Sequence, residues 1–386
     1  MKRLSLLVLI AALAIWAGSA SADENLAALQ QDAVETYADI VFASYQDSLE
    51  LAVALNEALI AFVSMPDEST LAAARDAWLA SNEPYGQTEA YRFYGGPIDD
   101  EDGPEGLLNA WPLDEAYIDY VDGDADAGII NNTADYPEIT KDLLISLNEV
   151  GAEENISTGY HAIEFLLWGQ DLYEDSAGKR PATDYSSAPN AERRGQYLLI
   201  TGELLVENLQ DMVDQWNHEI DDNYVWDFHD GPTDVALTNM LTGIGVLAKS
   251  ELAGERMFTA YDNQDQEDEH SCFSDNTHRD IITNFMGVSN VYRGAYTRID
   301  GTVVEGAGLA DLFEALAPEL NAEMLELLDL ADQQVNGIFV PFDRAIVNAD
   351  SRPGVFDAVF TLQDVGDKLV ELAVSLDLVI DTALPE

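Results

Sequence analysis

The chain has 386 residues, and 73 Asp and Glu against 17 Lys and Arg give it a net charge of −56 at pH 7. Such a surface repels nucleic acids and anionic membranes and raises the local concentration of cations, which argues against a nucleic-acid partner. Cys272 is the only cysteine, so no intramolecular disulfide can form and the packing of apolar residues must hold the fold together.

The N-terminus has the pattern of an export signal. Lys2 and Arg3 precede an apolar run over residues 4–16, and Ala20-Ser21-Ala22 supplies small residues at a cleavage site. This run is too short for a comfortable membrane span, and no later run is long enough to cross a bilayer. We therefore predict a signal peptide over residues 1–22 and an exported mature chain without a membrane span.

Helical periodicity dominates the rest of the chain, and strand-like alternation is nearly absent. Long helices are expected over residues 32–62, 191–217, 233–261 and 355–378, with shorter ones between them, and residues 309–338 are expected to form two helices separated at Pro318. The segment 223–233 contains Pro232 and few aliphatic residues, which suits a linker. We predict an all-α fold of two helical bundles, one over residues 23–225 and one over residues 226–386.

One segment of the first half, GYHAIEFLLWG at residues 159–169, places two ionisable residues in an otherwise apolar helix. His161 and Glu164 are three positions apart, so they lie on one face about a turn from each other. The helix is expected to be buried, and a buried imidazole and carboxylate each need a partner. That partner is either a metal ion or, more simply, the other residue of the pair, and the spacing alone leaves both open.

The run G-x-H-x-x-E at residues 159–164 resembles the hallmark of the imelysin family of bacterial periplasmic and outer-membrane proteins. Three further blocks are similar to this family, most of all to its iron-regulated protein A branch: PYGQTEAYRFYGGPID at 84–99, NAWPLDEAYIDY at 109–120 and DNQDQEDEHSCFSDNTH at 262–278. The resemblance implies two related four-helix bundles with a site between them. It also implies a periplasmic or outer-membrane-associated location and a role in iron acquisition, with another iron-uptake or membrane-associated component as partner.

The predicted metal ligands are His161 and Glu164 from the first half, with Glu267 and His270 from the second. Glu267 and His270 form E-x-x-H, the reverse of H-x-x-E, and paired carboxylate–histidine motifs that converge inside a bundle build many iron sites. Iron accepts mixed imidazole and carboxylate ligands, so we expect iron, with zinc as the alternative. The alternative for Glu267 to His270 is that, in so acidic a chain, this acidic run is only a solvent-exposed face.

Secondary candidates for the site come from the motif and from the matched blocks or their edges: Glu83, Glu89, Arg92, Asp114 and Gly159. The first three lie among aromatic residues, which suits either a cavity wall with a few polar groups or an aromatic core with surface charges. The run 249–256, KSELAGER, we interpret as a salt-bridged helix face with a structural role.

Two other functions remain open. Hydrolysis is described for one member type of the imelysin family, an insulin-cleaving metallopeptidase, and the same site would serve it. Zinc peptidases usually present H-E-x-x-H, and the His161 helix carries one histidine only. The other alternative is a polysaccharide- or peptide-binding module that uses the aromatic block from Tyr85 to Tyr94. We predict a metal-binding protein and leave open whether it is an enzyme.

Overall fold

The computed structural model describes residues 4–385, with side chains described from residue 24 onward. The predicted signal peptide, residues 1–22, lies outside the described side chains and stays a prediction. In the described part of the chain, no helix has the length and apolar character needed to cross a membrane.

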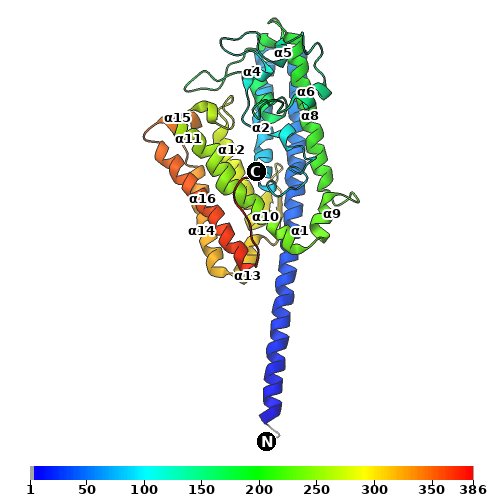
Figure 1. Cartoon of the computed structure of the whole chain (residues 1–386), viewed down its shortest axis with the longest axis vertical. Helices are drawn as coiled ribbons and strands as arrows, with labels where there is room; N and C mark the ends of the chain where they lie inside the picture. The colour runs from blue at the N-terminus through cyan, green and yellow to red at the C-terminus, as the bar shows by residue number, and fades with distance from the viewer. Residues whose placement is uncertain (1–3, 386) are drawn as a thin grey trace.

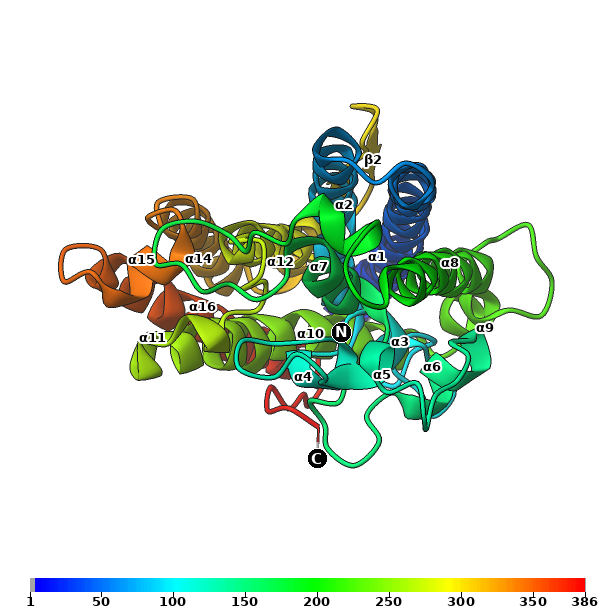
Figure 2. The ribbon, with the colours of Figure 1, turned by 90° about the horizontal axis from the view of Figure 1, so that it is seen from above.

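Four long helices form the first bundle. Helix α1 packs against α2 and α8, and α7 fits between α2 and α8 (Figures 1 and 2). Their bounds are α1 Leu4–Ser64, α2 Glu68–Thr88, α7 Gly159–Trp168 and α8 Ala191–Gln215. The long connection from α2 to α7 contains only short helices: η1 Glu89–Tyr91, α3 Glu105–Leu108, α4 Glu115–Ile118, α5 Gly128–Asn131 and α6 Lys141–Leu147. The link from α7 to α8 contains η2 Ala182–Tyr185.

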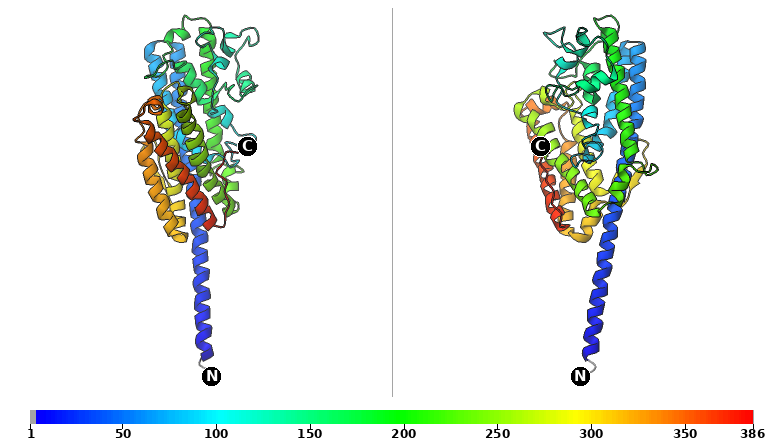
Figure 3. Two further views of the ribbon diagram at one scale, coloured as in Figure 1. Left: turned by 60° about the vertical axis from the view of Figure 1, so that its left-hand side comes forward. Right: turned by 45° about the vertical axis from the view of Figure 1, so that its right-hand side comes forward.

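A second group of helices lies alongside the first (Figures 2 and 3). One long helical stretch consists of α10 Thr233–Val246, the π-helix η3 Leu247–Phe258 and α11 Thr259–Asn263. The other long helices of this group are α12 Thr277–Arg293, α14 Pro318–Val335 and α16 Arg352–Ser375. Helix α16 packs against both η3 and α14, and α12 touches both as well. The remaining elements are η4 Gln266–Asp268, α13 Leu309–Leu316, α15 Phe342–Val347 and an antiparallel pair of strands, β1 Ala295–Thr297 and β2 Val303–Glu305.

The main contact between the two groups is that of α2 with α12. Gly287 of α12 makes this contact close, because a Cβ there would lie 2.3 Å from the carbonyl oxygen of Gln87. Asn284, also of α12, donates a hydrogen bond to the carbonyl oxygen of Gly86 at 2.9 Å. The C-terminal end of α2 is therefore held closely against the middle of α12.

The prediction of an all-α fold is confirmed, with β1 and β2 as the only strands among residues 4–385. The segment 223–233, which we expect to link the two bundles, contains the helix α9 (Tyr224–Asp230). Val225 and Phe228 are buried, and the ring of Phe228 stacks on that of Tyr37 in α1 with centroids 5.2 Å apart. The aromatic residues of this segment make it part of the first bundle.

Candidate functional site

Helix α7 is buried along its whole length, and Gly159 determines how it begins. All ten residues from Gly159 to Trp168 are buried. Gly159 has a φ of +87°, and a Cβ there would lie 2.5 Å from the carbonyl oxygen of Leu108 at the end of α3. Glycine alone adopts this conformation readily and leaves room for that carbonyl group. The first residue of G-x-H-x-x-E therefore allows α7 to start directly against α3.

His161 and Glu164 contact each other, as their spacing predicts. Nδ1 of His161 lies 3.1 Å from Oε2 of Glu164. The other carboxylate oxygen, Oε1, accepts hydrogen bonds from the backbone N–H of Ser274 at 2.9 Å and from its hydroxyl at 2.6 Å. Burial raises the pKa of Glu164, and the hydrogen bond from His161 opposes that rise. Both oxygens of this carboxylate are therefore engaged by groups of the protein.

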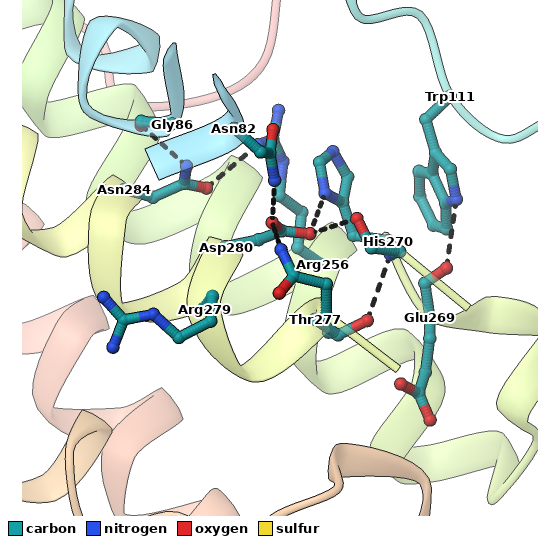
Figure 4. Close-up of polar contacts among 12 residues, drawn as sticks. Asn82, Gly86, Trp111, Arg256, Glu269, His270, Thr277, Arg279, Asp280 and Asn284 are labelled. Carbon is teal, nitrogen blue, oxygen red and sulfur yellow. Dashed lines mark hydrogen bonds and ion pairs between the residues drawn. The ribbon is translucent and has the colours of Figure 1, made fainter. Parts of the chain in front are cut away.

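His270 has the same arrangement with Asp280 of α12. Nδ1 of His270 lies 2.9 Å from Oδ2 of Asp280 (Figure 4). Asp280 also accepts hydrogen bonds from the hydroxyl of Ser271 at 2.5 Å and from Nδ2 of Asn82 at 2.6 Å. Burial, and after it the positive charge of Arg256, holds the pKa of His270 well below its ordinary value. His270 is therefore a neutral imidazole at physiological pH.

The rings of His161 and His270 meet edge to face, with centroids 4.5 Å apart and planes at 87°. Since each Nδ1 faces a carboxylate oxygen that can accept a hydrogen bond, we assign a proton to Nδ1 of each ring, and the neutral imidazole of His270 then has a lone pair on Nε2. Both Nε2 atoms are buried, and neither has a hydrogen-bond partner among the described residues. Buried polar atoms are rarely left in this state, because each unsatisfied one costs roughly 1–3 kcal/mol.

Beside the histidine pair lies a buried ion-pair network centred on Glu89. Its Oε2 is 2.6 Å from Nη1 of Arg92 and 2.6 Å from Nη2 of Arg256. Burial alone would raise the pKa of Glu89, but the two guanidinium groups outweigh it and lower that pKa to about 2. Arg256 also donates to Oδ1 of Asn284 at 2.9 Å. The network joins η1, η3 and α12 beneath the pair.

Within the run 249–256, which we interpret as a salt-bridged helix face, Arg256 pairs with Glu251 at 2.8 Å and also reaches Glu89 of η1. Its side chain is buried and reaches the centre of the molecule. Lys249, from the same run, pairs with Asp367 of α16 and is half-buried. The run forms part of the π-helix η3, which packs against α12 on one side and α16 on the other, so its charged residues point in different directions.

The structure brings three of the four predicted ligands together, namely His161, Glu164 and His270, but not Glu267. Glu267 lies in η4 and is exposed, and within the described residues no hydrogen bond or ion pair joins its side chain to the other three. The expectation that Glu267 and His270 share a helix face is wrong. The helix η4 ends at Asp268 and Glu269 is extended, so a three-residue spacing does not give one face here.

The secondary candidates divide in the same way. Glu89 and Arg92 belong to the buried network, and Gly159 sets the start of α7. Glu83 instead pairs with Arg279 of α12 at 2.7 Å, where both side chains are partly exposed. Asp114 accepts a backbone N–H in the first turn of α4 at 2.9 Å and so acts as a helix cap.

Sequence reasoning missed Asp280, Asn284 and Trp111. Asp280 and Asn284 are four positions apart in α12 and interrupt an otherwise apolar face, so a buried polar stripe was a readable signal. Trp111 packs its ring against that of His270 with centroids 5.8 Å apart and donates from Nε1 to the carbonyl oxygen of Glu269 at 3.2 Å (Figure 4). Nothing in the sequence indicates that contact, because it joins residues from the two halves of the chain.

The comparisons with known proteins agree with this architecture. The family model described as Imelysin matches residues 41–373. Iron-regulated protein A of Synechococcus elongatus is 25% identical over 356 residues, which cover 90% of this chain and 86% of that protein.

Two solved structures share the fold. An iron-regulated protein A precursor from Parabacteroides distasonis has a TM-score of 0.71 at 22% identity, over 90% of this chain and 95% of its own. An imelysin-like protein from Psychrobacter arcticum has a TM-score of 0.63 at 12% identity, over 92% of this chain and 97% of its own. Since the family model spans most of the sequence, this chain belongs to the imelysin family.

Proposed function

We propose that this chain is an exported iron-binding protein that acts in iron acquisition and holds iron between His161 and His270. Membership of the imelysin family and the similarity to a protein named iron-regulated protein A support a role connected with iron. The name of another relative, a precursor, supports export. The large negative charge would draw cations toward the surface, whichever site they finally occupy.

The observation that carries the proposal is the pair of buried, unpartnered Nε2 atoms. Histidines that bind metal ions usually donate their second ring N–H to a carboxylate or carbonyl group, which fixes the tautomer and the ring orientation. Here Glu164 holds Nδ1 of His161, and Asp280 holds Nδ1 of His270. The Nε2 atoms of two imidazoles thus lie in a buried place, which suits an Fe²⁺ ion.

This arrangement changes the ligand set that the sequence suggests. Glu164 becomes a positioning residue, because its two oxygens already accept hydrogen bonds from His161 and Ser274. In the part of the chain that the structure describes, no group of three or more His, Cys, Asp or Glu side chains has the geometry to hold a metal ion. The bound iron would therefore keep oxygen ligands such as water at its remaining positions.

An anaerobic titration with Fe²⁺ tests the proposal. The purified chain is compared with the variants His161→Ala and His270→Ala, and with His278→Ala as a control, since Nδ1 of His278 faces the carbonyl oxygen of Asp275 at 3.1 Å. The assay is run at high salt, which screens weak binding by the acidic surface. We expect one iron per chain in the native protein and in the control, and none in the two site variants. Equal iron in all four proteins would disprove the site, and stoichiometric zinc in place of iron would favour the peptidase alternative.

A further inference from the structure

A cavity of about 480 Å³ is lined in part by residues 109–112 and by residues of η3, and we call it the vestibule. Trp111 lines the vestibule and also packs against His270. Arg256 and Asn109 line it as well, and both bond to Glu89 in the buried network. Trp111 therefore contacts both the vestibule and His270. Nε2 of His270 has no hydrogen-bond partner among the described residues.

Negative charge prevails in the vestibule. Two arginines, Arg92 and Arg256, face six carboxylate residues: Asp99, Glu105, Glu149, Glu153, Glu251 and Glu255. Both arginines are neutralised from within the protein. Arg92 lies 2.6 Å from Glu89 and 2.9 Å from Glu105, and Arg256 lies 2.6 Å from Glu89 and 2.8 Å from Glu251. These carboxylates balance both positive charges, and of the two groups only Arg92 has an Nε without a hydrogen-bond partner among the described residues.

Three of these carboxylates are exposed and form the rim of the vestibule: Glu149, Glu153 and Glu255. They come from the loop after α6 and from η3, so the two halves of the chain both contribute. Among the described residues, the two arginines of the vestibule form their ion pairs with Glu89, Glu105 and Glu251 and with none of these three carboxylates. Carboxylates concentrated in a cleft focus their field and steer cations inward.

We propose that the vestibule admits iron as a hydrated Fe²⁺ cation and rejects anionic ferric chelates. This inference rests on the function proposed above and names the form of iron that the same site takes. A hydrated ion with six waters needs roughly 200 Å³, at about 30 Å³ per water, and so fits the cavity. A ferric citrate complex carries carboxylates of its own, and the unpaired carboxylates of the rim repel it.

Rapid-mixing kinetics test the inference. The rim variant carries Glu149→Gln, Glu153→Gln and Glu255→Gln, and its matched control carries Glu50→Gln, Glu57→Gln and Glu326→Gln, exposed positions of α1 and α14 that make the same change in net charge. We expect the association rate of Fe²⁺ to fall about tenfold in the rim variant at low ionic strength, with a weaker salt dependence, and to change much less in the control. Ferric citrate should not bind to the native protein.

Equal rates in the rim variant and its control would overturn the inference, and so would native binding of ferric citrate as tight as that of Fe²⁺. Either result leaves the histidine site standing if His161→Ala still abolishes iron binding. A native protein that binds no stoichiometric Fe²⁺ would overturn the proposed function and this inference together. Circular dichroism melts of both triple variants check that all substitutions leave the fold intact.

Discussion

His161 of the first bundle and His270 of the second lie with their ring centroids 4.5 Å apart and their planes almost perpendicular. Each ring is held at Nδ1 by a carboxylate from its own half of the chain, Glu164 for His161 and Asp280 for His270. The two halves thus contribute equivalent imidazole–carboxylate units to one place. A role for this contact in binding would require both halves to be folded and packed together.

The orienting carboxylates give the first prediction. Glu164→Gln and Asp280→Asn should each lower the affinity for Fe²⁺ about 10- to 100-fold, because the loss of a partner that orients a metal-binding histidine typically has this effect. The stoichiometry should stay at one iron, as measured by anaerobic titration. The control is Glu83→Gln, whose carboxylate pairs with Arg279 instead. An unchanged affinity in Glu164→Gln would contradict the role of Glu164 in orienting His161. Complete loss of iron would indicate that Glu164 binds the metal directly.

Gly159 gives a prediction about stability. Gly159→Ala should lower the free energy of unfolding by about 1–3 kcal/mol or more, because it adds strain at a φ of +87° and a clash with the carbonyl oxygen of Leu108. Gly123→Ala is the matched control, since Gly123 has a φ of +84° and nothing lies within 4 Å of its added Cβ. Urea denaturation of both variants separates the two effects. A loss in Gly159→Ala no greater than that in Gly123→Ala would show that the contact with α3 is unimportant.

A buried ion-pair cluster supports the first bundle near the site. Oδ2 of Asp119 lies 2.6 Å from Nη1 of Arg180 and 2.6 Å from Nε of Arg194, and all three side chains are almost fully buried. Asp119→Asn should lower the free energy of unfolding by about 3–5 kcal/mol, because it leaves buried guanidinium charge without its partner. Glu207→Gln is the control, because it removes an exposed ion pair with Lys141 that contributes at most about 1 kcal/mol. Similar losses in the two variants would refute the role of burial.

The pH dependence of stability should depend in part on His229 of α9. Burial lowers the pKa of His229, but hydrogen bonds to Asp230 and to Glu35 of α1 outweigh this and raise the pKa above its ordinary value. The stabilisation is therefore fully present below the unfolded-state pKa of about 6.5 and is lost as the pH rises through the higher folded-state pKa. Thermal melts from pH 5 to about pH 8 should show this loss in the native chain and not in His229→Gln.

His278→Gln is the control for that experiment, because burial lowers the pKa of His278. Its removal should leave the loss of stability with rising pH in place. If the melting temperatures of His229→Gln and of the native chain depend on pH in the same way, the hydrogen bonds of His229 to Glu35 and Asp230 do not raise its pKa.

The parts of this fold that follow from local sequence were predictable. Helical periodicity identified the all-α fold, and the three-residue spacing in G-x-H-x-x-E correctly placed His161 against Glu164. The same spacing failed for Glu267 and His270, because η4 is too short to carry the pattern onward. Residues three positions apart share a face only where the segment is a helix. The polar run at 262–278 has no apolar periodicity, so the sequence does not show whether this segment is helical.

The rest of the site depends on contacts between distant segments. The salt-bridged helix face predicted for residues 249–256 does not reveal that Arg256 is buried, where it meets Glu89 and Asn284 from other elements. Asp280 has no neighbour in sequence that indicates a histidine partner. The pairings of Arg256 depend on how η3 packs against η1 and α12, which periodicity alone does not determine.

The most direct test of the central claim is anomalous diffraction at the iron absorption edge, from crystals of the native chain grown anaerobically with one equivalent of Fe²⁺. The account predicts a single strong peak about 2 Å from both Nε2 of His161 and Nε2 of His270, a distance usual for a metal bound to imidazole nitrogen. Peaks confined to surface carboxylates, with both Nε2 atoms left without a metal, would contradict it.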